Sequence, residues 1–369
     1  MLFSVSREAP DGGGRTPLLR APSAPLAAQL RVRGFEAKDR PAWNEFVNRH
    51  SEGTFCHLAE WQDVLQRAFG HATYYLIAER GGVIFGVLPL AHIKSAIFSN
   101  ALVSTPFCVY GGVLADDAVA GDALIEKACA LARRLRVDYL ELRNLRRSQP
   151  TWPSKDLYVT FRKPIKTASE DNMLAIPRKQ RAMVRKGIQK ELRVEIDSGV
   201  ERLYSIYSES LRNLGTPIFS QRYLRVLREV FGESAEVLTI SHEGRAIASV
   251  LSFYFKGDVL PYYGGGTTEA RALAGNDFMY WSVMERARDR GVRTFDYGRS
   301  KRGTGAFDFK VNWGFEPQPL FYEYFLVRAK TMPNLSPTNP KFDRLIRIWR
   351  RLPLPLTQWL GPPLAKYLG

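Results

Sequence analysis

The sequence predicts a mixed α/β fold that is used twice along the chain. The segment LQRAFG at Leu65 to Gly70 recurs as LREVFG at Leu227 to Gly232, a shift of 162 positions. The same shift relates two further pairs, Trp61 with Tyr223 and Gly82 with Gly244. A single offset that links three features indicates an internal duplication. The content of 45% hydrophobic and 12% aromatic residues is typical of a globular protein.

Hydrophobic periodicity places the elements of the first half in order. A strand is expected at Leu30 to Phe35, and a helix at Arg40 to Arg49. A second helix is expected because apolar residues recur at helical spacing, namely Leu58, Trp61, Leu65 and Ala68 or Phe69. Two strands, YYLIAE and VIFGVLPLAHI, are joined by a hairpin turn at Gly81-Gly82. The half then ends with a strand in VYGGVL, a long helix at Ala118 to Arg134 and a strand in VDYLELRN.

The second half repeats this order with loops of unequal length. The shift becomes 153 where VYGG at Val109 meets YYGG at Tyr262, and 155 where YLEL at Tyr139 meets TFDY at Thr294. Each half is therefore predicted to hold a strand, helices, a β-hairpin, another strand, a long helix and a final strand. A further strand, FYEYFLVRA from Phe321, is expected to close onto one of the sheets.

Changes in composition divide the chain into segments. They are a flexible N-terminal arm at residues 1–28, a first domain at 29–161, a basic connector helix at 162–193, a second domain at 194–330 and a basic amphipathic tail at 331–369. The connector has ten basic residues against three acidic ones. Its Arg178, Arg181 and Arg185 share one helical face, which suits a phosphate or carboxylate partner; a solvated helix face is the alternative.

The tail combines an apolar helical face with a basic one. The apolar positions are Phe342, Leu345, Ile346 and Trp349, and the basic positions are Arg344, Arg347, Arg350 and Arg351. This pattern is typical of a helix that lies in an anionic membrane interface. Docking of the helix on the protein's own core is the alternative. We favour the membrane because the following residues stay apolar, at Leu352, Leu354, Leu356, Trp359 and Leu360.

Charge and cysteine content limit the classes of function. The formal net charge of +16 predicts a negative partner: nucleic acid, an anionic membrane surface, or a phosphorylated or acidic substrate. Nucleic acid is the least favoured, because the basic residues do not gather around exposed stacking aromatic residues. The sequence has no apolar run of about 18 residues that would span a membrane. The three cysteines lie far apart in apolar surroundings and the five histidines lack metal-ligand spacing, so we expect a reduced cytoplasmic protein without a metal.

The stretch Thr294 to Gly314 carries the densest group of candidate functional residues. A short buried strand breaks at Gly298 into a basic loop with the residues Arg299, Lys301, Arg302, Gly303 and Gly305. Phe307, Phe309, Lys310 and Trp313 then fall within seven residues. The lysine is thus set between large apolar groups, where its ammonium would lose part of its hydration. A surface lysine beside two core aromatic residues is the alternative.

Together with the duplicated half, four motifs resemble the Fem-like peptidoglycan aminoacyltransferases. They are YYGGG from Tyr262, GNDFMYWSVMERARDRG from Gly275, FDYGRS from Phe295 and FDFKVNWG from Phe307. The sequence most closely resembles the FemAB-related proteins associated with exosortase (PEP-CTERM) and exopolysaccharide gene clusters. The likeness runs from about Arg31 to Arg328 and is strongest between Tyr262 and Tyr324. It implies two tandem acetyltransferase-like (GNAT) domains, which agrees with the duplication. The amphipathic helical tail, predicted above from its periodicity, follows these domains.

The resemblance also implies a reaction. The family transfers amino acids from aminoacyl-tRNA to amines of a cell-wall precursor, and more distant relatives use other acyl donors. Its Phe-Lys pair falls on Phe309 and Lys310, and the lysine would stabilise the oxyanion that forms when an amine attacks an ester or thioester. Phe309 and Trp313 would wall a water-poor site. The sequence lacks the long charged helical hairpin that some Fem ligases insert, so the donor stays open between aminoacyl-tRNA and acyl-CoA, with no cofactor bound.

The basic loop supplies further candidates. Arg299 and Arg302 are expected to bind an anionic part of the donor or acceptor. The motif SKRGTG from Ser300 is similar to the GNAT acetyl-CoA loop, but it has Ser in place of the first Gln or Arg. Gly303 and Gly305 would then either cradle a pyrophosphate or let the loop pass close to another backbone or to substrate.

Residues on either side of the loop are candidates too, each with a structural alternative. Asp296 and Tyr297 at a strand end would orient or deprotonate the acceptor amine, or Asp296 would cap a loop. Tyr262 and Tyr263 would line the cleft or form an ordinary strand edge. Asn276, with its neighbour Asp277, would contact substrate or, more simply, cap a helix.

We therefore expect an acyltransferase that forms an amide, held at the inner face of the membrane near an anionic or lipid-linked envelope precursor. Only the second half has the glycine pair and the Phe-Lys pair, so it is expected to be the catalytic copy. An acyl-CoA-dependent N-acyltransferase and a non-catalytic scaffold of envelope polysaccharide assembly are the alternatives. If Lys310 is catalytic, Lys310→Ala is expected to abolish transfer and leave the melting temperature nearly unchanged.

Overall fold

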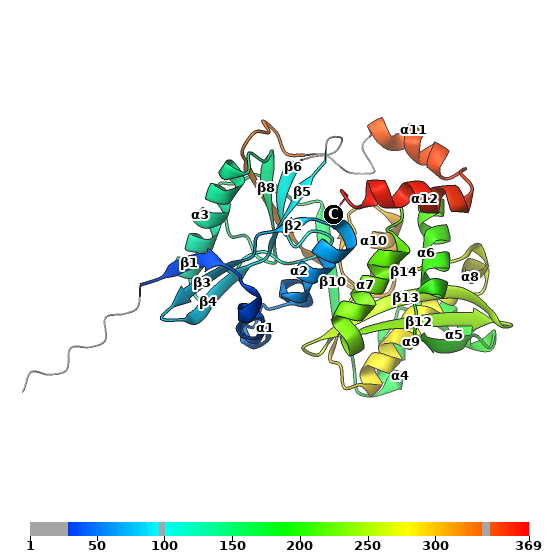
Figure 1. Cartoon of the computed structure of the whole chain (residues 1–369). Coiled ribbons are helices and arrows are strands. Elements are labelled where there is room, and N and C mark those ends of the chain that lie inside the picture. The colour runs from blue at the N-terminus through cyan, green and yellow to red at the C-terminus, as the bar shows by residue number, and fades with distance from the viewer. Residues whose placement is uncertain (1–28, 96–99, 334–339, 369) are drawn as a thin grey trace, which may run out of the picture.

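The computed structural model describes residues 29–95, 100–333 and 340–368. Two α/β lobes lie side by side, and two C-terminal helices cover one edge of the second lobe (Figure 1). The predicted N-terminal arm at 1–28 and part of the linker before the tail, 334–339, lie outside the described residues. The described ranges contain no helix that is long and apolar enough to cross a membrane.

The first lobe has two sheets, with strand orders β1-β3-β4-β7 and β2-β5-β6-β8-β18-β9. The helix α3 packs against β3, β4 and β8. The predicted helices at 40–49 and 118–134 are confirmed with these bounds. The elements are β1 (Arg31–Gly34), α1 (Arg40–Arg49), α2 (Glu60–Val64), a π-helical turn (Leu65–Phe69), β2 (Ala72–Thr73), β3 (Leu76–Arg80), β4 (Val83–Leu88), β5 (Leu90–Lys94), β6 (Asn100–Ser104), β7 (Leu114–Ala115), α3 (Ala118–Arg134), β8 (Tyr139–Asn144) and β9 (Ser154–Lys155).

The second lobe has one sheet in the order β11-β12-β13-β14-β15-β10-β16, with β17 paired to β10. Its elements are β10 (Tyr158–Pro164), α4 (Ser169–Ala175), α5 (Arg178–Gln189), β11 (Arg193–Asp197), α6 (Glu201–Leu214), α7 (Gln221–Phe231), β12 (Ala235–His242), β13 (Arg245–Phe255), β14 (Asp258–Gly266), α8 (Thr268–Ala272), α9 (Gly275–Asp289), β15 (Thr294–Asp296), β16 (Ser300–Lys301), α10 (Gly305–Asn312) and β17 (Pro317–Pro319). The chain ends with β18 (Phe321–Leu326), α11 (Pro340–Trp349) and α12 (Leu354–Ala365).

Alternation along the strands explains how helices cover both faces of the second sheet. Val237 and Leu251 join one apolar core with residues of α6 and α7, including Leu203 and Leu224. Their neighbours Leu238 and Val250 join another core with Met279 of α9 and its surroundings. Successive side chains of β12 and β13 therefore point into two different cores, and the sheet is buried between layers of helices.

The predicted duplication is present in the structure. β8 and β15 begin at the equivalent residues Tyr139 and Thr294, and each pairs in parallel with an earlier strand of its own lobe, β8 with β6 and β15 with β14. The equivalence of VYGG with YYGG is wrong in one respect, because Val109 to Gly112 form a loop rather than a strand. Positive φ values at Thr105 and Phe107 turn the chain away from the sheet after β6.

Two strands cross between the lobes. β10 straddles the predicted boundary at residue 161 and pairs with β15, β16 and β17 of the second lobe. β18 returns to the first lobe, where it pairs with β8 from Phe321–Asn144 to Leu326–Tyr139. The predicted closing strand from Phe321 is thus confirmed, and it closes the sheet of the first half. The sheet of the first lobe is therefore completed by a strand that follows the second lobe in the sequence.

The repeated helices meet at the seam between the lobes. The ring of Phe55, just before α2, lies 4.5 Å from that of Phe231 at the end of α7 and 4.3 Å from that of Phe253 on β13. These residues belong to one apolar core that draws on both lobes. Cys56 and Cys108 lie in it, and all three cysteines are buried and free. The lobes therefore share a core and form one body.

The C-terminal helices lie against the second lobe and also touch the first. α12 packs on α6, and its Gly361 lies against Ile218. The carbonyl of Lys366 accepts a hydrogen bond from Nε2 of His71, which belongs to the first lobe, at 2.8 Å. The tail therefore docks on the protein's own surface, as the alternative to the membrane predicts, although several of its apolar side chains stay exposed.

Candidate functional site

Lys310 lies on α10 beneath the loop that follows β15. Thr304 caps α10, accepting a hydrogen bond from the Phe307 amide, and the helix then carries Lys310 inward to 9% exposure. Its Nζ donates to the carbonyls of Tyr297, Gly298 and Arg299 at 2.7, 3.0 and 3.1 Å. An ammonium has three N–H donors, so all of them are used by these carbonyls. Lys310 therefore fixes the turn between β15 and the basic loop.

Burial dominates the electrostatics of Lys310. It lowers the pKa of the ammonium from 10.5 to about 7; the Asp296 carboxylate acts in the opposite direction, and the Arg299 guanidinium adds to the lowering. Nζ also lies 5.5 Å from the ring of Phe161 and 5.4 Å from that of Tyr297. Among the described residues no carboxylate accepts a hydrogen bond from this lysine. The site thus holds a desolvated amine that is poised between its charged and neutral forms near neutral pH.

The two predicted wall residues differ in position. Phe309 is half-buried, with its ring 5.8 Å from that of Tyr280. Trp313 is fully buried, and its Nε1 donates to Oδ1 of Asp277 at 2.9 Å. The same carboxylate oxygen accepts from Nε2 of Gln180 at 2.6 Å. Trp313 therefore anchors α10 to α9 and α5 from within the core, rather than lining an opening.

Asp296, at the end of β15, is buried at the seam. Its carboxylate accepts from the Tyr110 hydroxyl of the first lobe at 2.9 Å and from the Gly298 amide at 2.9 Å. Nε of Arg162 lies 3.4 Å away. Burial raises the pKa of Asp296, and Arg162 opposes that rise. The residue thus caps the turn at Gly298, the alternative given above, and it also ties the two lobes together.

Arg299 continues this network towards the first lobe. Its guanidinium lies 4.7 Å from the ring of Tyr158 and donates to the hydroxyl of Tyr322 at 3.1 Å. Arg143, buried on β8, also lies over the Tyr322 ring at 5.3 Å, but it has Glu141 as its counterion. No ion pair of Arg299 occurs within the described part of the chain. Arg299 is thus a cation held by aromatic rings, with no acidic partner there.

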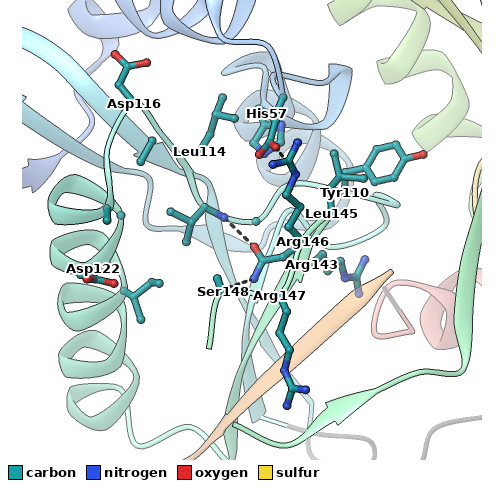
Figure 2. A pocket seen from close by; sticks show the side chains of 18 of the residues that line it. His57, Tyr110, Leu114, Asp116, Asp122, Arg143, Leu145, Arg146, Arg147 and Ser148 are labelled. Carbon is teal, nitrogen blue, oxygen red and sulfur yellow. Dashed lines mark hydrogen bonds and ion pairs between the residues drawn. The ribbon is translucent and has the colours of Figure 1, made fainter. Parts of the chain in front are cut away.

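The first lobe contains a pocket of about 430 Å³ beside this network (Figure 2). It lies between β7, the first turns of α3 and the end of β8, and its lining includes Tyr110, Arg143 and Asn144. The Asn144 carboxamide accepts from the Val113 amide at 3.1 Å and donates to Ser148 at 2.9 Å. Tyr110 and Arg143 belong both to the pocket and to the contacts of Asp296 and Tyr322. The pocket thus connects with the Lys310 turn through two side chains.

Sequence reasoning missed this pocket. The available signal in the sequence was the polar pair Arg143-Asn144 at the end of a predicted strand. In the fold both residues are buried, and Asn144 lies close to Gly112. A Cβ at Gly112 would lie 1.8 Å from Oδ1 of Asn144, so the glycine is needed for the asparagine to reach the Val113 amide. In the sequence Val113 and Asn144 are 31 positions apart, and periodicity does not bring them together.

The basic loop is more open than predicted. A Cβ at Gly303 or Gly305 would meet no atom within 4 Å, so neither glycine is there for a close approach to another backbone. Gly303 instead has a φ of +72°, which favours glycine, and Gly305 begins α10. Arg302 is exposed, and Ser300 is buried with no hydrogen-bond partner for its Oγ among the described residues. Space over the two glycines is free for a ligand.

The tyrosine pair on β14 is in the seam rather than at an open cleft. The Tyr262 hydroxyl accepts from the Val109 amide at 3.1 Å and donates to the Phe107 carbonyl at 3.0 Å. The Tyr263 hydroxyl pairs with that of Tyr223 at 2.7 Å. Tyr262 therefore holds the 105–113 loop of the first lobe against the second lobe. These two hydrogen bonds satisfy its hydroxyl, so no ligand is needed to explain its position.

Two predicted residues keep an unpaired polar atom. Asn276 is not the cap of α9, since Ala274 occupies that position and Asn276 lies inside the first turn. Its Oδ1 is buried and accepts no hydrogen bond from the described ranges. Tyr297 is buried too, and its hydroxyl has no hydrogen-bond partner in the described part of the chain. Its ring packs edge-to-face against those of Tyr280 and Phe315, with ring centroids 4.7 and 5.0 Å apart. Tyr297 belongs to the core under the Lys310 turn, whereas Asn276 lies close to Gly266 of β14.

Arg178 and Arg181 are grouped away from the loop arginines. A second cavity, of about 460 Å³, is lined by Arg178, Arg181, Ala182, Arg185 and Gln189, all on α5. The three arginines share a face of this helix as predicted, and they form no ion pair within the described ranges. Those ranges also contain no group of three His, Cys, Asp or Glu side chains that could hold a metal ion.

Comparison with known proteins defines the class of fold. Residues 176–311 match the family model described as an acetyltransferase (GNAT) domain, which contains β11 to β15 and the Lys310 segment. No curated protein matches the sequence. The fold resembles the crystal structure of FemX, with a TM-score of 0.63 at 14% identity over 81% of this chain and 98% of that one.

Two further structures share the arrangement of tandem lobes. A tandem GNAT protein from the clavulanic acid biosynthesis pathway has a TM-score of 0.53 at 13% identity, over 80% of this chain and 98% of that chain. L-PGS from Bacillus licheniformis has a TM-score of 0.50 at 11% identity, over 79% and 96%. The protein thus has the tandem GNAT fold that the sequence predicts, followed by two C-terminal helices.

Proposed function

We propose that the protein is an acyltransferase that joins an acyl or aminoacyl group to an amine, with its reacting site in the second lobe around Lys310. The single observation that carries this proposal is the environment of the lysine. Lys310 is a buried cation with a lowered pKa, and the described residues give it backbone carbonyls but no carboxylate as hydrogen-bond acceptors. The GNAT match of residues 176–311 supports the same placement.

The chemistry requires a positive charge where an oxygen becomes negative. As the amine nitrogen attacks the acyl carbonyl, an N–C bond forms and the carbonyl oxygen gains charge. The C=O bond then re-forms while the C–O or C–S bond to the donor breaks, and the proton lost by the nitrogen reaches the leaving oxygen or sulfur through solvent. The acyl oxygen would replace one of the two longer acceptors of Nζ, the carbonyls of Gly298 and Arg299. A fixed donor of this kind contributes roughly 100- to 1000-fold in rate.

We assign binding of an anionic group to Arg299 and to the pocket in the first lobe. Arg299 has no acidic partner among the described residues, and Arg143 of the pocket lies over the same tyrosine ring. A phosphate or carboxylate of the donor or acceptor would be attracted by both guanidiniums. The cavity on α5 with Arg178 and Arg181 offers a separate binding site for an anion. Arg302, in the basic loop, is exposed.

The test compares Lys310→Met and Lys310→Arg with the unchanged protein, measuring amide formation with acyl-CoA and, separately, with aminoacyl-tRNA as donor. Lys163→Met is the matched control, because Lys163 also has a burial-lowered pKa, donates to one carbonyl and lies 5.6 Å from an aromatic ring. We expect the Lys310 variants to lose at least about 100-fold in rate, and the control to keep its activity. Equal losses in the control would contradict the proposal.

The donor and pathway are finer parts of the proposal. We favour a FemAB-like transfer to an envelope or exopolysaccharide precursor, on the motifs from Tyr262 to Gly314. An acyl-CoA-dependent reaction is the second candidate, supported by the open space over Gly303 and Gly305, and calorimetric titration with CoA separates the two. A non-catalytic scaffold would show no turnover with either donor and would be insensitive to loss of Lys310.

A further inference from the structure

The helix α12 has two distinct apolar sides. Thr357, Gly361 and Ala365 follow one another at four-residue intervals and are buried where the tail docks on the protein. On the opposite side, Leu356, Trp359 and Pro363 are exposed, and Trp359 is 73% exposed. The whole helix, LPLTQWLGPPLA, has no charged residue. Docking therefore accounts for one side of α12, and the other side is an apolar surface that the described residues leave exposed.

The outer side of α11 mixes apolar and basic residues. Ile346 faces the body of the protein, since a Cβ at Gly215 would lie 2.5 Å from it. Leu345 and Ile348 are exposed, Leu345 to 61%, and exposed arginines stand between and beside them, namely Arg344, Arg347 and Arg351. The apolar face predicted from the sequence is thus divided, because Ile346 packs inward while Leu345 points away from the protein.

Charge selects the kind of surface that would cover this face. The segment 340–368 has six basic residues and one acidic residue, Asp343. Exposed Trp and Leu beside arginines match an interface in which rings enter the boundary of headgroups and acyl chains while guanidiniums meet phosphates. A second copy of this chain would bring the same positive charge to the contact, which disfavours self-association there.

We propose that the outer face of α11 and α12 binds the surface of an anionic lipid bilayer, with Leu356 and Trp359 inserted at the headgroup boundary. The tail contacts α6 of the second lobe and, through Lys366, His71 of the first lobe, so a bound tail orients both lobes against the membrane. The surface lies outside the Lys310 site. The proposal therefore goes beyond the acyl-transfer proposal and does not depend on it.

The experiment is flotation of the full-length protein with vesicles, without donor or acceptor. Vesicles of phosphatidylcholine with 30% phosphatidylglycerol, about the anionic fraction that gives a clear surface potential, are compared with pure phosphatidylcholine. We expect binding to the anionic vesicles that weakens at high salt. Brominated lipids should quench tryptophan fluorescence in the unchanged protein and less in Trp359→Phe.

Two variants separate the apolar and basic contributions. Leu356→Ser with Trp359→Ser removes the apolar side, and its control is Val119→Ser with Leu174→Ser, two apolar residues outside the tail that are each 62% exposed. Arg344, Arg347 and Arg351 changed to Gln remove three charges, and Arg178, Arg181 and Arg185 changed to Gln remove the same number from α5. Each basic residue near an anionic surface gives about a fivefold factor, so the tail triple should lose up to roughly 100-fold in partitioning. Thermal unfolding checks that every variant is folded.

Three outcomes would overturn the proposal. The first is no binding, or equal binding to neutral and anionic vesicles. The second is an equal loss for the two arginine triples, because net charge rather than this face would then control binding. The third is a dimer, measured by sedimentation, that Leu356→Ser with Trp359→Ser converts to a monomer. None of these results bears on amide formation, which is measured in solution with soluble donors.

Discussion

Arg67 and Glu229 form an ion pair across the seam, although they occupy equivalent positions in the two halves of the duplication. Each is the third residue of its repeat, LQRAFG or LREVFG. Equivalent residues meet each other only near a pseudo-twofold axis, as in a symmetric dimer. The two halves are therefore arranged like the subunits of a homodimer, with one partner carrying Arg and the other Glu where true symmetry would repeat one residue.

This pair is expected to contribute little to stability. Both side chains are about half exposed, 48% and 49%, and exposed pairs are worth about 0.2–1 kcal/mol. Arg67→Ala and Glu229→Ala should therefore each change the free energy of unfolding in urea by less than about 1 kcal/mol. Phe231→Ala, which removes a buried ring from the same seam, should cost about 3–5 kcal/mol. A larger effect of Arg67→Ala than of Phe231→Ala would contradict a seam held by apolar packing.

Lys310 is expected to make stability depend on pH. Its pKa is about 7 in the folded protein and near 10.5 when unfolded, so between these values the unfolded chain binds more protons. The contribution of Lys310 to the free energy of unfolding should then be smallest below pH 7 and rise towards pH 10.5. Urea unfolding of the unchanged protein and of Lys310→Met at pH 6.5, 8 and 9.5 measures the difference. A difference that stays constant or falls with pH would mean that the pKa is not lowered.

The contacts of Lys310 change the melting temperature that we expect for Lys310→Ala. From the sequence we expect little change in melting temperature, but the structure gives the ammonium three buried carbonyl partners. Buried acceptors left unpaired cost about 1–3 kcal/mol each, less where water enters the space. Lys310→Ala should therefore lower both activity and melting temperature. The change in melting temperature alone therefore does not distinguish a catalytic lysine from a structural one. The activity of Lys310→Ala, compared with that of Lys163→Met, makes this distinction.

Tyr322→Phe tests the hydroxyl that connects Arg299 to the first lobe. This buried hydroxyl accepts from Arg299 and donates to the Val109 carbonyl at 2.7 Å. Its removal should destabilise the fold by about 1–3 kcal/mol and, by loosening Arg299, raise KM more than it lowers kcat. Tyr324→Phe on the same strand is the control, because the Tyr324 hydroxyl forms no hydrogen bond with the described residues. Equal effects of the two variants would refute a special role for Tyr322.

The two loop glycines are expected to respond differently to alanine. Gly303→Ala places a side chain at a φ of +72° and should cost about 1 kcal/mol. Gly305→Ala meets open space at the start of α10 and should be neutral or stabilising by up to about 1 kcal/mol. If a ligand covers this loop, Gly305→Ala should weaken binding of that ligand without loss of stability. CoA titration of Gly305→Ala by calorimetry measures it directly.

Local pattern was sufficient to predict many elements and insufficient for the seam. The helix at 118–134 is predictable because it has an apolar face and begins after Asp117, whose carboxylate accepts from the Ala120 amide. Val109 to Gly112 has the composition of a strand, yet it forms a loop whose residues fill the contact between lobes. Tertiary packing overrides propensity there, and one sequence contains no sign of it.

The candidate site was predictable to a similar degree. Aromatic residues on both sides of Lys310 predict its burial, which the structure shows. Its three carbonyl acceptors were not predictable, because they depend on the turn at Gly298, with φ +65°, that aims successive backbone oxygens at one point. The pocket of the first lobe needed the fold as well, since Tyr110 and Arg143 come together only when the 105–113 loop lies over β8.

The crossing of β10 and β18 affects how the chain is made. The sheet of the first lobe lacks its strand beside β8 until residue 326 has left the ribosome, almost two hundred residues after β8 itself. At about 5–20 residues per second, the nascent chain would expose that unpaired edge for roughly ten seconds or more. The first half cannot complete its fold during its own synthesis. A ribosome that stalled between the two copies would therefore display an open strand edge, the kind of surface that chaperones must shield.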